Sequence, residues 1–165
     1  MIILKKKDII VGSIFIFLLG SLLHFTYDLS CKNYIVGVFS AINESVFEHT
    51  KLILYPIIIW YLIYYLKNKD DVNRNYLFSS MIINIVFSIL IIPFLFYFYT
   101  EAFGIESLIL DIVIFYISSL SGLLIASKYY HKKINLPWIP LIIIIIVLYT
   151  VATFYPPNIP IFLLK

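Results

Sequence analysis

The sequence predicts an all-α protein, a polytopic membrane helical bundle with five transmembrane helices. Of its 165 residues, 62% are hydrophobic and only 13% are charged, whereas about 25% of residues are charged in a soluble domain. The mean hydropathy is +1.01. Five apolar runs approach the length of about 20 residues that a helix needs to cross a hydrocarbon core. Because lipid offers no partners for backbone N–H and C=O groups, these runs must be helices.

The five predicted helices follow one another in a single integral membrane domain, residues 1–165. They cover about residues 9–27, 43–66, 76–99, 105–127 and 137–155. The first has the basic start and apolar body of a signal peptide, but no small-x-small cleavage site follows it, so we expect an uncleaved helix. Two further segments, "CKNYIVGVFSAI" and "FYPPNIPIFLLK", are expected either to cover the outer polar residues or to settle in the headgroup region.

The positive charges predict the orientation of these helices. Nine of the twelve Lys and Arg residues precede the first helix or lie in alternate connections, which share one side of the membrane. Cations are retained on the cytoplasmic side of short loops, so we predict a cytoplasmic N-terminus and an external C-terminus. These nine cations are Lys5, Lys6, Lys7, Lys67, Lys69, Arg74, Lys128, Lys132 and Lys133.

The stretch "NESVFEHTK", residues 43–51, concentrates charge at the external start of the second predicted helix. At 100° per residue, Glu44, Glu48 and Lys51 fall within about 60° of one another, while His49 projects about 100° away from Glu48. The stretch therefore has two polar sides. A purely structural role is the alternative, because Ser45 and Glu48 have the spacing of a helix capping box.

Other helices bring ionisable residues to the same outer level. His24 and Asp28 are four residues apart on one face of the first helix, and Asp111 lies in the fourth. Ionisable groups inside a bilayer are expensive and usually mark function. For Asp111 the expected partners are Lys51, His24 or a bound cation. The third helix carries a stripe of small polar residues that predicts either interhelical contacts or a transport path: Ser80, Asn84 and Ser88.

Imidazoles and carboxylates are ligands for a divalent metal such as zinc, and they also act as general acids and bases. We therefore predict a hydrolase that cuts a lipid or membrane peptide near the external leaflet, with two overlapping residue sets. The catalytic candidates are Glu44, Glu48, His49, Lys51 and Asp111, and the metal-ligand candidates are His24, Asp28, Glu48 and His49. A small transporter or cation-binding protein, or an accessory subunit, is the alternative.

The partners expected from the sequence are the lipid bilayer, such a substrate, no nucleic acid, and further copies of the chain. The stretch "FSAINESVFEHTKLILYP", with "LLHFTYDLS" before it and "LDIVIF" and "YPPNIP" after it, resembles a family of small uncharacterised bacterial integral membrane proteins. The resemblance spans nearly the whole chain and rests on the pattern Asn-Glu-Ser-x-x-Glu-His-x-Lys. It implies a multi-pass protein of the bacterial plasma membrane and supports the choice of site residues. It implies no particular activity, because the family has none assigned.

Overall fold

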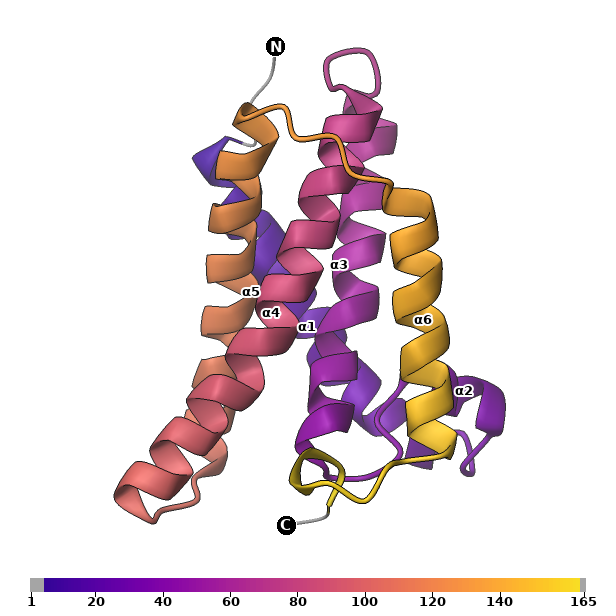
Figure 1. Cartoon of the computed structure of the whole chain (residues 1–165), viewed down its shortest axis with the longest axis vertical. Helices are drawn as coiled ribbons and strands as arrows, with labels where there is room; N and C mark the ends of the chain where they lie inside the picture. Colours follow the sequence, from indigo (N-terminus) through magenta and orange to yellow (C-terminus); the bar gives the residue numbers. More distant parts are fainter. Residues whose placement is uncertain (1–4, 164–165) are drawn as a thin grey trace.

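The computed structural model describes residues 5–163, and these contain helices and connecting segments but no strand. Seven elements follow one another (Figure 1): α1 Lys6–Leu29, α2 Tyr34–Phe39, α3 Val46–Asn68, α4 Arg74–Phe103, α5 Leu108–His131, α6 Trp138–Phe154 and the 3₁₀ turn η1 Pro160–Phe162. The long helices run up and down alternately, so α1, α4 and α6 end, and α3 and α5 begin, at the same end of the bundle, which is the lower end in Figure 1. We call this the site end; it carries Leu29, Val46, Phe103, Leu108 and Phe154.

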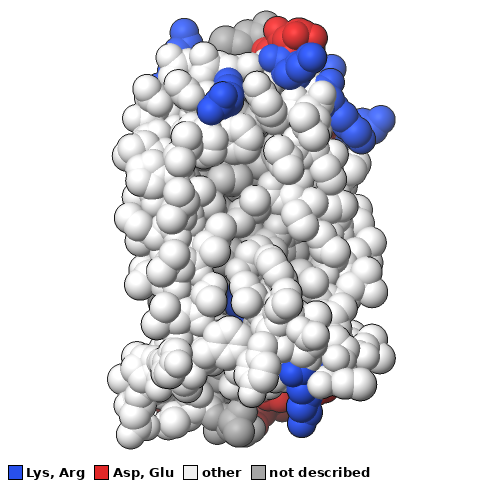
Figure 2. Space-filling view, turned by 90° about the vertical axis from the view of Figure 1, so that its right-hand side faces the viewer, with Lys and Arg blue, Asp and Glu red and all other residues white. Residues whose placement is uncertain are grey.

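Four helices in the described residues, α1, α3, α4 and α5, are long and apolar enough to cross a membrane. The fifth predicted helix is present as α6, but its 17 residues span only about 25 Å at about 1.5 Å per residue. Figure 2 shows a face on which the charged residues gather at the two ends, with a broad and almost uncharged band between them. Such a band is what contact with hydrocarbon requires.

Capping residues set helix ends that differ from the expected ones. α3 begins at Val46 rather than near Asn43, because the Ser45 side chain caps the helix by accepting a hydrogen bond from the Glu48 N–H at 3.4 Å. α4 continues to Phe103 and stops where Gly104 adopts the left-handed conformation, with φ of 63°. Both ends fall where side-chain or backbone chemistry satisfies the terminal helix groups.

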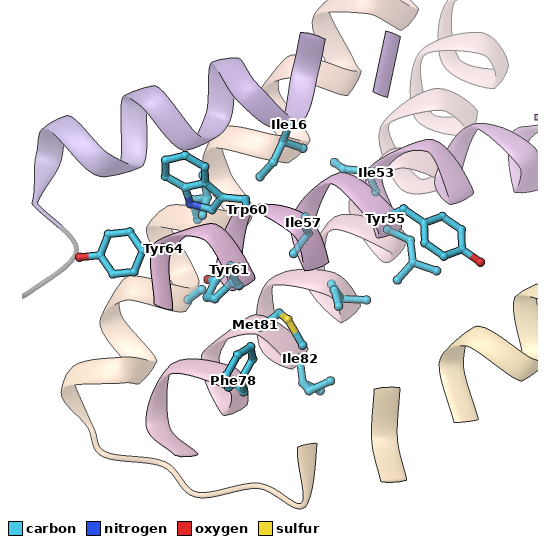
Figure 3. Packing of buried hydrophobic residues seen from close by; sticks show 14 of the residues in the cluster. Ile16, Ile53, Tyr55, Ile57, Trp60, Tyr61, Tyr64, Phe78, Met81 and Ile82 are labelled. Atoms are coloured by element: carbon cyan, nitrogen blue, oxygen red, sulfur yellow. The ribbon is translucent and has the colours of Figure 1, made fainter. Parts of the chain in front are cut away.

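The core lies around α3, which packs between α1 and α4, while α5 packs against both α1 and α4. Figure 3 shows aliphatic and aromatic side chains from α1, α3 and α4 meeting there, with Ile16, Ile57 and Met81 among those that are almost fully buried. Small residues permit the closest approaches. A Cβ on Gly20 of α1 would lie 2.6 Å from the ring of Phe115 and 2.8 Å from the carbonyl oxygen of Leu52.

The polar stripe of α4 is buried, and two of its residues, Asn84 and Ser88, lie where α4 packs against α5. The Ser88 hydroxyl is 3.3 Å from the Ser118 carbonyl oxygen and 3.1 Å from the Asn84 Oδ1 atom. Gly122 of α5 approaches these two side chains so closely that a Cβ there would collide with both. The stripe therefore makes interhelical contacts in this structure.

Candidate functional site

Two histidines and a glutamate converge at the site end, and we call them the His–Glu triad. His24 lies on α1, His49 lies on the first turns of α3, and Glu44 lies in the connection just before α3. The two histidine Nε2 atoms are 3.3 Å apart, and each is 3.4 Å from the Glu44 Oε2 atom. The side chains are partly exposed: 28% for His24, 35% for His49 and 66% for Glu44. The triad is therefore accessible from outside the bundle.

The local sequence explains how Glu44 and His49 come to face one another. The Asn43 side chain accepts a hydrogen bond from the Ser45 N–H at 2.9 Å, which tightens the turn that holds Glu44. The Nδ1 atom of His49 lies 3.0 Å from the Ser45 carbonyl oxygen. A carbonyl can only accept, so Nδ1 carries the proton in this bond, and Nε2 presents its lone pair to the triad when the ring is neutral.

The spacing of the triad fits a tetrahedral metal ion. Zinc binds histidine nitrogen and carboxylate oxygen at about 2.0–2.2 Å. A tetrahedron's edge is about 1.6 times the bond length, so neighbouring ligand atoms in such a site lie about 3.3–3.6 Å apart. The three separations in the triad, 3.3, 3.4 and 3.4 Å, match one face of that tetrahedron. Among the described residues, this group has three ligand side chains, and two histidines with one glutamate are the three protein ligands of one class of catalytic zinc site.

The triad borders a cavity of about 310 Å³ enclosed by α1, α3, α4 and α5. Most of its wall is apolar and includes aromatic rings from three helices: Phe17, Phe96 and Phe115. Asp111 and Glu106 add two carboxylates on the side formed by the start of α5. The Tyr99 hydroxyl donates a hydrogen bond to one oxygen of Asp111 at 2.7 Å and so fixes that carboxylate. The cavity thus combines an apolar interior with a polar mouth.

Glu48 and Lys51 lie apart from the triad, in a buried ion pair. The Lys51 ammonium is 2.6 Å from Glu48 Oε2, and the side chains are 0% and 2% exposed. Lys51 also donates to the Gly37 carbonyl at 2.8 Å and to the Thr153 hydroxyl at 3.0 Å. Glu48 accepts from the Ile42 N–H and from Thr153, each at 3.0 Å. The pair therefore joins α2, α3 and α6.

This arrangement separates residues that were expected to form one polar stripe. Glu44 precedes the Ser45 cap and so is not on the helix, which removes it from the face of Glu48 and Lys51. Its side chain joins His49 instead. The two outer segments lie by the ion pair rather than over the cavity: α2 supplies Gly37, and Phe162 of η1 stacks on Phe47 of α3 with ring centres 4.3 Å apart.

The remaining predicted residues take different positions. Asp28 is exposed one turn beyond His24 and is not part of the triad. Asp111 lines the same cavity as the triad, but its hydrogen-bond partner is Tyr99 rather than Lys51 or His24. Sequence reasoning missed Tyr99 and Thr153. Both lie in strongly apolar helices, where a single hydroxyl gives no periodic signal that would single it out.

Comparisons with known proteins identify the family of this chain. No curated protein and no solved structure matches the chain. A family model, that of the Family of unknown function (DUF6512), matches residues 1–165. The chain therefore belongs to the DUF6512 family.

Proposed function

We propose that the chain is a membrane-embedded hydrolase that depends on a divalent transition metal such as zinc held by the His–Glu triad. The observation that carries this proposal is the triad geometry: three ligand atoms 3.3–3.4 Å apart, bordering an apolar cavity. Two histidines and a glutamate are a known ligand set of catalytic zinc. When bound, the metal would polarise a carbonyl oxygen and provide a hydroxide nucleophile at neutral pH.

The residues around the metal have distinct parts in this proposal. His24 and His49 supply neutral nitrogen ligands, and Glu44 supplies one carboxylate oxygen. The Ser45 carbonyl holds the His49 ring in the ligating orientation through Nδ1. Asp111, fixed by Tyr99, lines the cavity beside the triad, where it would orient the substrate. The apolar cavity holds the hydrophobic part of the substrate.

The buried ion pair is assigned a structural part instead. Glu48 and Lys51 are enclosed, and their charged atoms are engaged with one another and with backbone and hydroxyl groups. Neither side chain can reach a substrate without breaking that network. A transport path is less well supported than hydrolysis, because Asn84 and Ser88 of the polar stripe are used in contacts with α5.

Metal content is the direct test of the triad. Purified wild-type protein should hold about one zinc per chain, measured by elemental mass spectrometry after dialysis against zinc-free buffer. His24→Ala, His49→Ala and Glu44→Gln should each lose most of that metal, since three-ligand sites rarely survive the loss of one ligand. Asp28→Asn is the matched control, because Asp28 lies one turn from His24 outside the triad.

Activity and folding complete the test. The three triad variants should keep the helical circular dichroism of the wild type in detergent and lose hydrolysis of ester or amide lipids, while Asp28→Asn keeps both. A wild-type protein that binds no zinc at a micromolar zinc concentration would refute the proposal. Retained hydrolysis in metal-free protein would instead favour an acid–base mechanism at the same histidines.

The proposed orientation places the triad at the external face, with all five long helices crossing the bacterial plasma membrane and the N-terminus in the cytoplasm. It is supported by the nine cations, which all belong to the end opposite the triad. Cys31 is the protein's single cysteine, is exposed and lies at the site end, so it is a natural reporter. A membrane-impermeant maleimide should label it in intact cells; labelling only after lysis would reverse the orientation.

A further inference from the structure

We propose that the cavity binds a lipid with a cationic, ammonium-bearing head group, whose apolar chain fills the space between α1, α3, α4 and α5. This inference names the substrate class of the proposed hydrolase and rests on that function. It follows from two independent properties of the cavity, which are the chemistry of its walls and the sign of the charge around its mouth.

The walls select an apolar chain. The rings of Phe17, Phe96 and Phe115 and the side chains of Ile92 and Leu52 line the cavity from four helices. A volume of about 310 Å³ lies at the small end of ligand pockets, which span about 300–1,000 Å³. A space of this volume suits one hydrocarbon chain and is too small for even one turn of a substrate helix, which is about 10–12 Å across with its side chains. A lipid therefore fits better than a membrane peptide.

The charges at the mouth select a cation. Three carboxylates line the cavity, those of Glu44, Glu106 and Asp111, and no lysine or arginine is among the described residues that line it. With a divalent ion in the triad, the formal charge is +2 − 3 = −1. A bound divalent metal therefore still leaves one net negative charge around the mouth. An anionic phosphate head group would meet these carboxylates without an arginine or lysine to pair with it.

Asp111 is the best-prepared partner for the ammonium group. Its position is fixed by the 2.7 Å hydrogen bond from Tyr99, which uses one carboxylate oxygen. The Ser107 N–H in turn lies 3.4 Å from the Tyr99 hydroxyl oxygen, so the start of α5 and the end of α4 hold the same group. A preformed carboxylate loses little freedom on binding, which strengthens the charge pair.

Binding to metal-free protein tests this inference separately from the metal proposal. The probes are dodecyltrimethylammonium and dodecyl sulfate, which share one chain and differ in charge, titrated into protein in zwitterionic nanodiscs. Wild type should bind the ammonium probe at least about tenfold more tightly. Asp111→Asn should lose most of that preference, whereas Glu101→Gln should keep it, because Glu101 is an exposed acid of α4 that does not line the cavity.

A second variant covers the possibility that Asp111→Asn fails to fold. Ile112→Trp adds bulk at a cavity-lining residue that is already 47% exposed and should weaken both probes about equally. Equal affinity of wild type for the two probes, or a preference for the sulfate, would overturn the inference even if the triad holds zinc. If the wild type prefers the ammonium probe but cannot bind zinc, the inference stands and the metal-dependent hydrolase is refuted.

Discussion

Removing the buried ammonium by Lys51→Met should cost about 3 kcal/mol of unfolding free energy. The substitution keeps the length of the side chain but leaves the Glu48 carboxylate buried without its counter-charge. Breaking one partner of a buried ion pair costs about 3–5 kcal/mol. We expect the lower end of this range, because Glu48 keeps its hydrogen bonds from the Ile42 N–H and the Thr153 hydroxyl.

The double variant distinguishes the interaction between Glu48 and Lys51 from the interactions that each makes with the rest of the protein. Glu48→Gln alone should also cost about 3 kcal/mol, since it strands the ammonium, whereas Lys51→Met with Glu48→Gln should cost little more than either single change. The expected coupling energy is therefore about 3 kcal/mol. Lys32→Met is the control, because Lys32 is an exposed cation at the same end of the bundle.

Unfolding by sodium dodecyl sulfate in mixed micelles, followed by circular dichroism, measures these free energies for the wild type and the four variants. Limited proteolysis of the connection between α1 and α3 provides a second readout, since the pair holds α2 through the Gly37 carbonyl. We expect faster cleavage in Lys51→Met and an unchanged rate in Lys32→Met. A single-variant cost below about 1 kcal/mol, or strictly additive effects, would refute the view that this pair stabilises the site end.

Three further outcomes are expected. Gly122→Ala should destabilise the protein by about 1–3 kcal/mol in the same unfolding assay, because the new methyl group collides with Asn84 and Ser88. A variant as stable as the wild type would contradict the close contact. Zinc affinity should fall as the pH is lowered from about 7.5 to about 5.5, since protons compete with zinc for the imidazoles. Competition with a chelating dye measures this affinity, and a constant value would argue against histidine ligands. Tyr99→Phe should reduce hydrolysis about tenfold at unchanged metal content, because Asp111 loses the hydroxyl that fixes it.

The helices were predictable because the bilayer imposes a length that hydropathy reveals directly. Their ends were less so. The expected start near Asn43 and the observed start at Val46 differ because the Ser45 side chain, rather than hydropathy, decides where the helix begins. The same reasoning applies at Gly104, whose left-handed conformation ends α4 four residues later than expected. Apolarity marks a segment, whereas single capping contacts mark its limits.

The depth of the candidate site in the bundle was predictable from the sequence. The residues that form it were predictable only in part. His24 and His49 come from two helices and meet, as a shared depth in the bilayer suggests. Asp28 shares the α1 face with His24 by spacing, yet it lies exposed a turn further out. Which residues of one level touch depends on how the helices are rotated and packed. For α1 this depends on Gly20, whose lack of a side chain permits contact with Phe115 and Leu52.

The three-residue difference at the start of α3 decides what the charged stretch can do. If the helix began at Asn43, Glu44 would share a face with Glu48 and Lys51, and three charges would compete for one buried network. Because Ser45 caps the helix, Glu44 is released to the other side and joins the histidines, while Glu48 and Lys51 neutralise one another inside. One short segment thus supplies both a closed ion pair that fastens the bundle and an accessible carboxylate beside two imidazoles. A variant that moves the helix start, such as Ser45→Ala, is therefore expected to disturb the triad before it disturbs the ion pair.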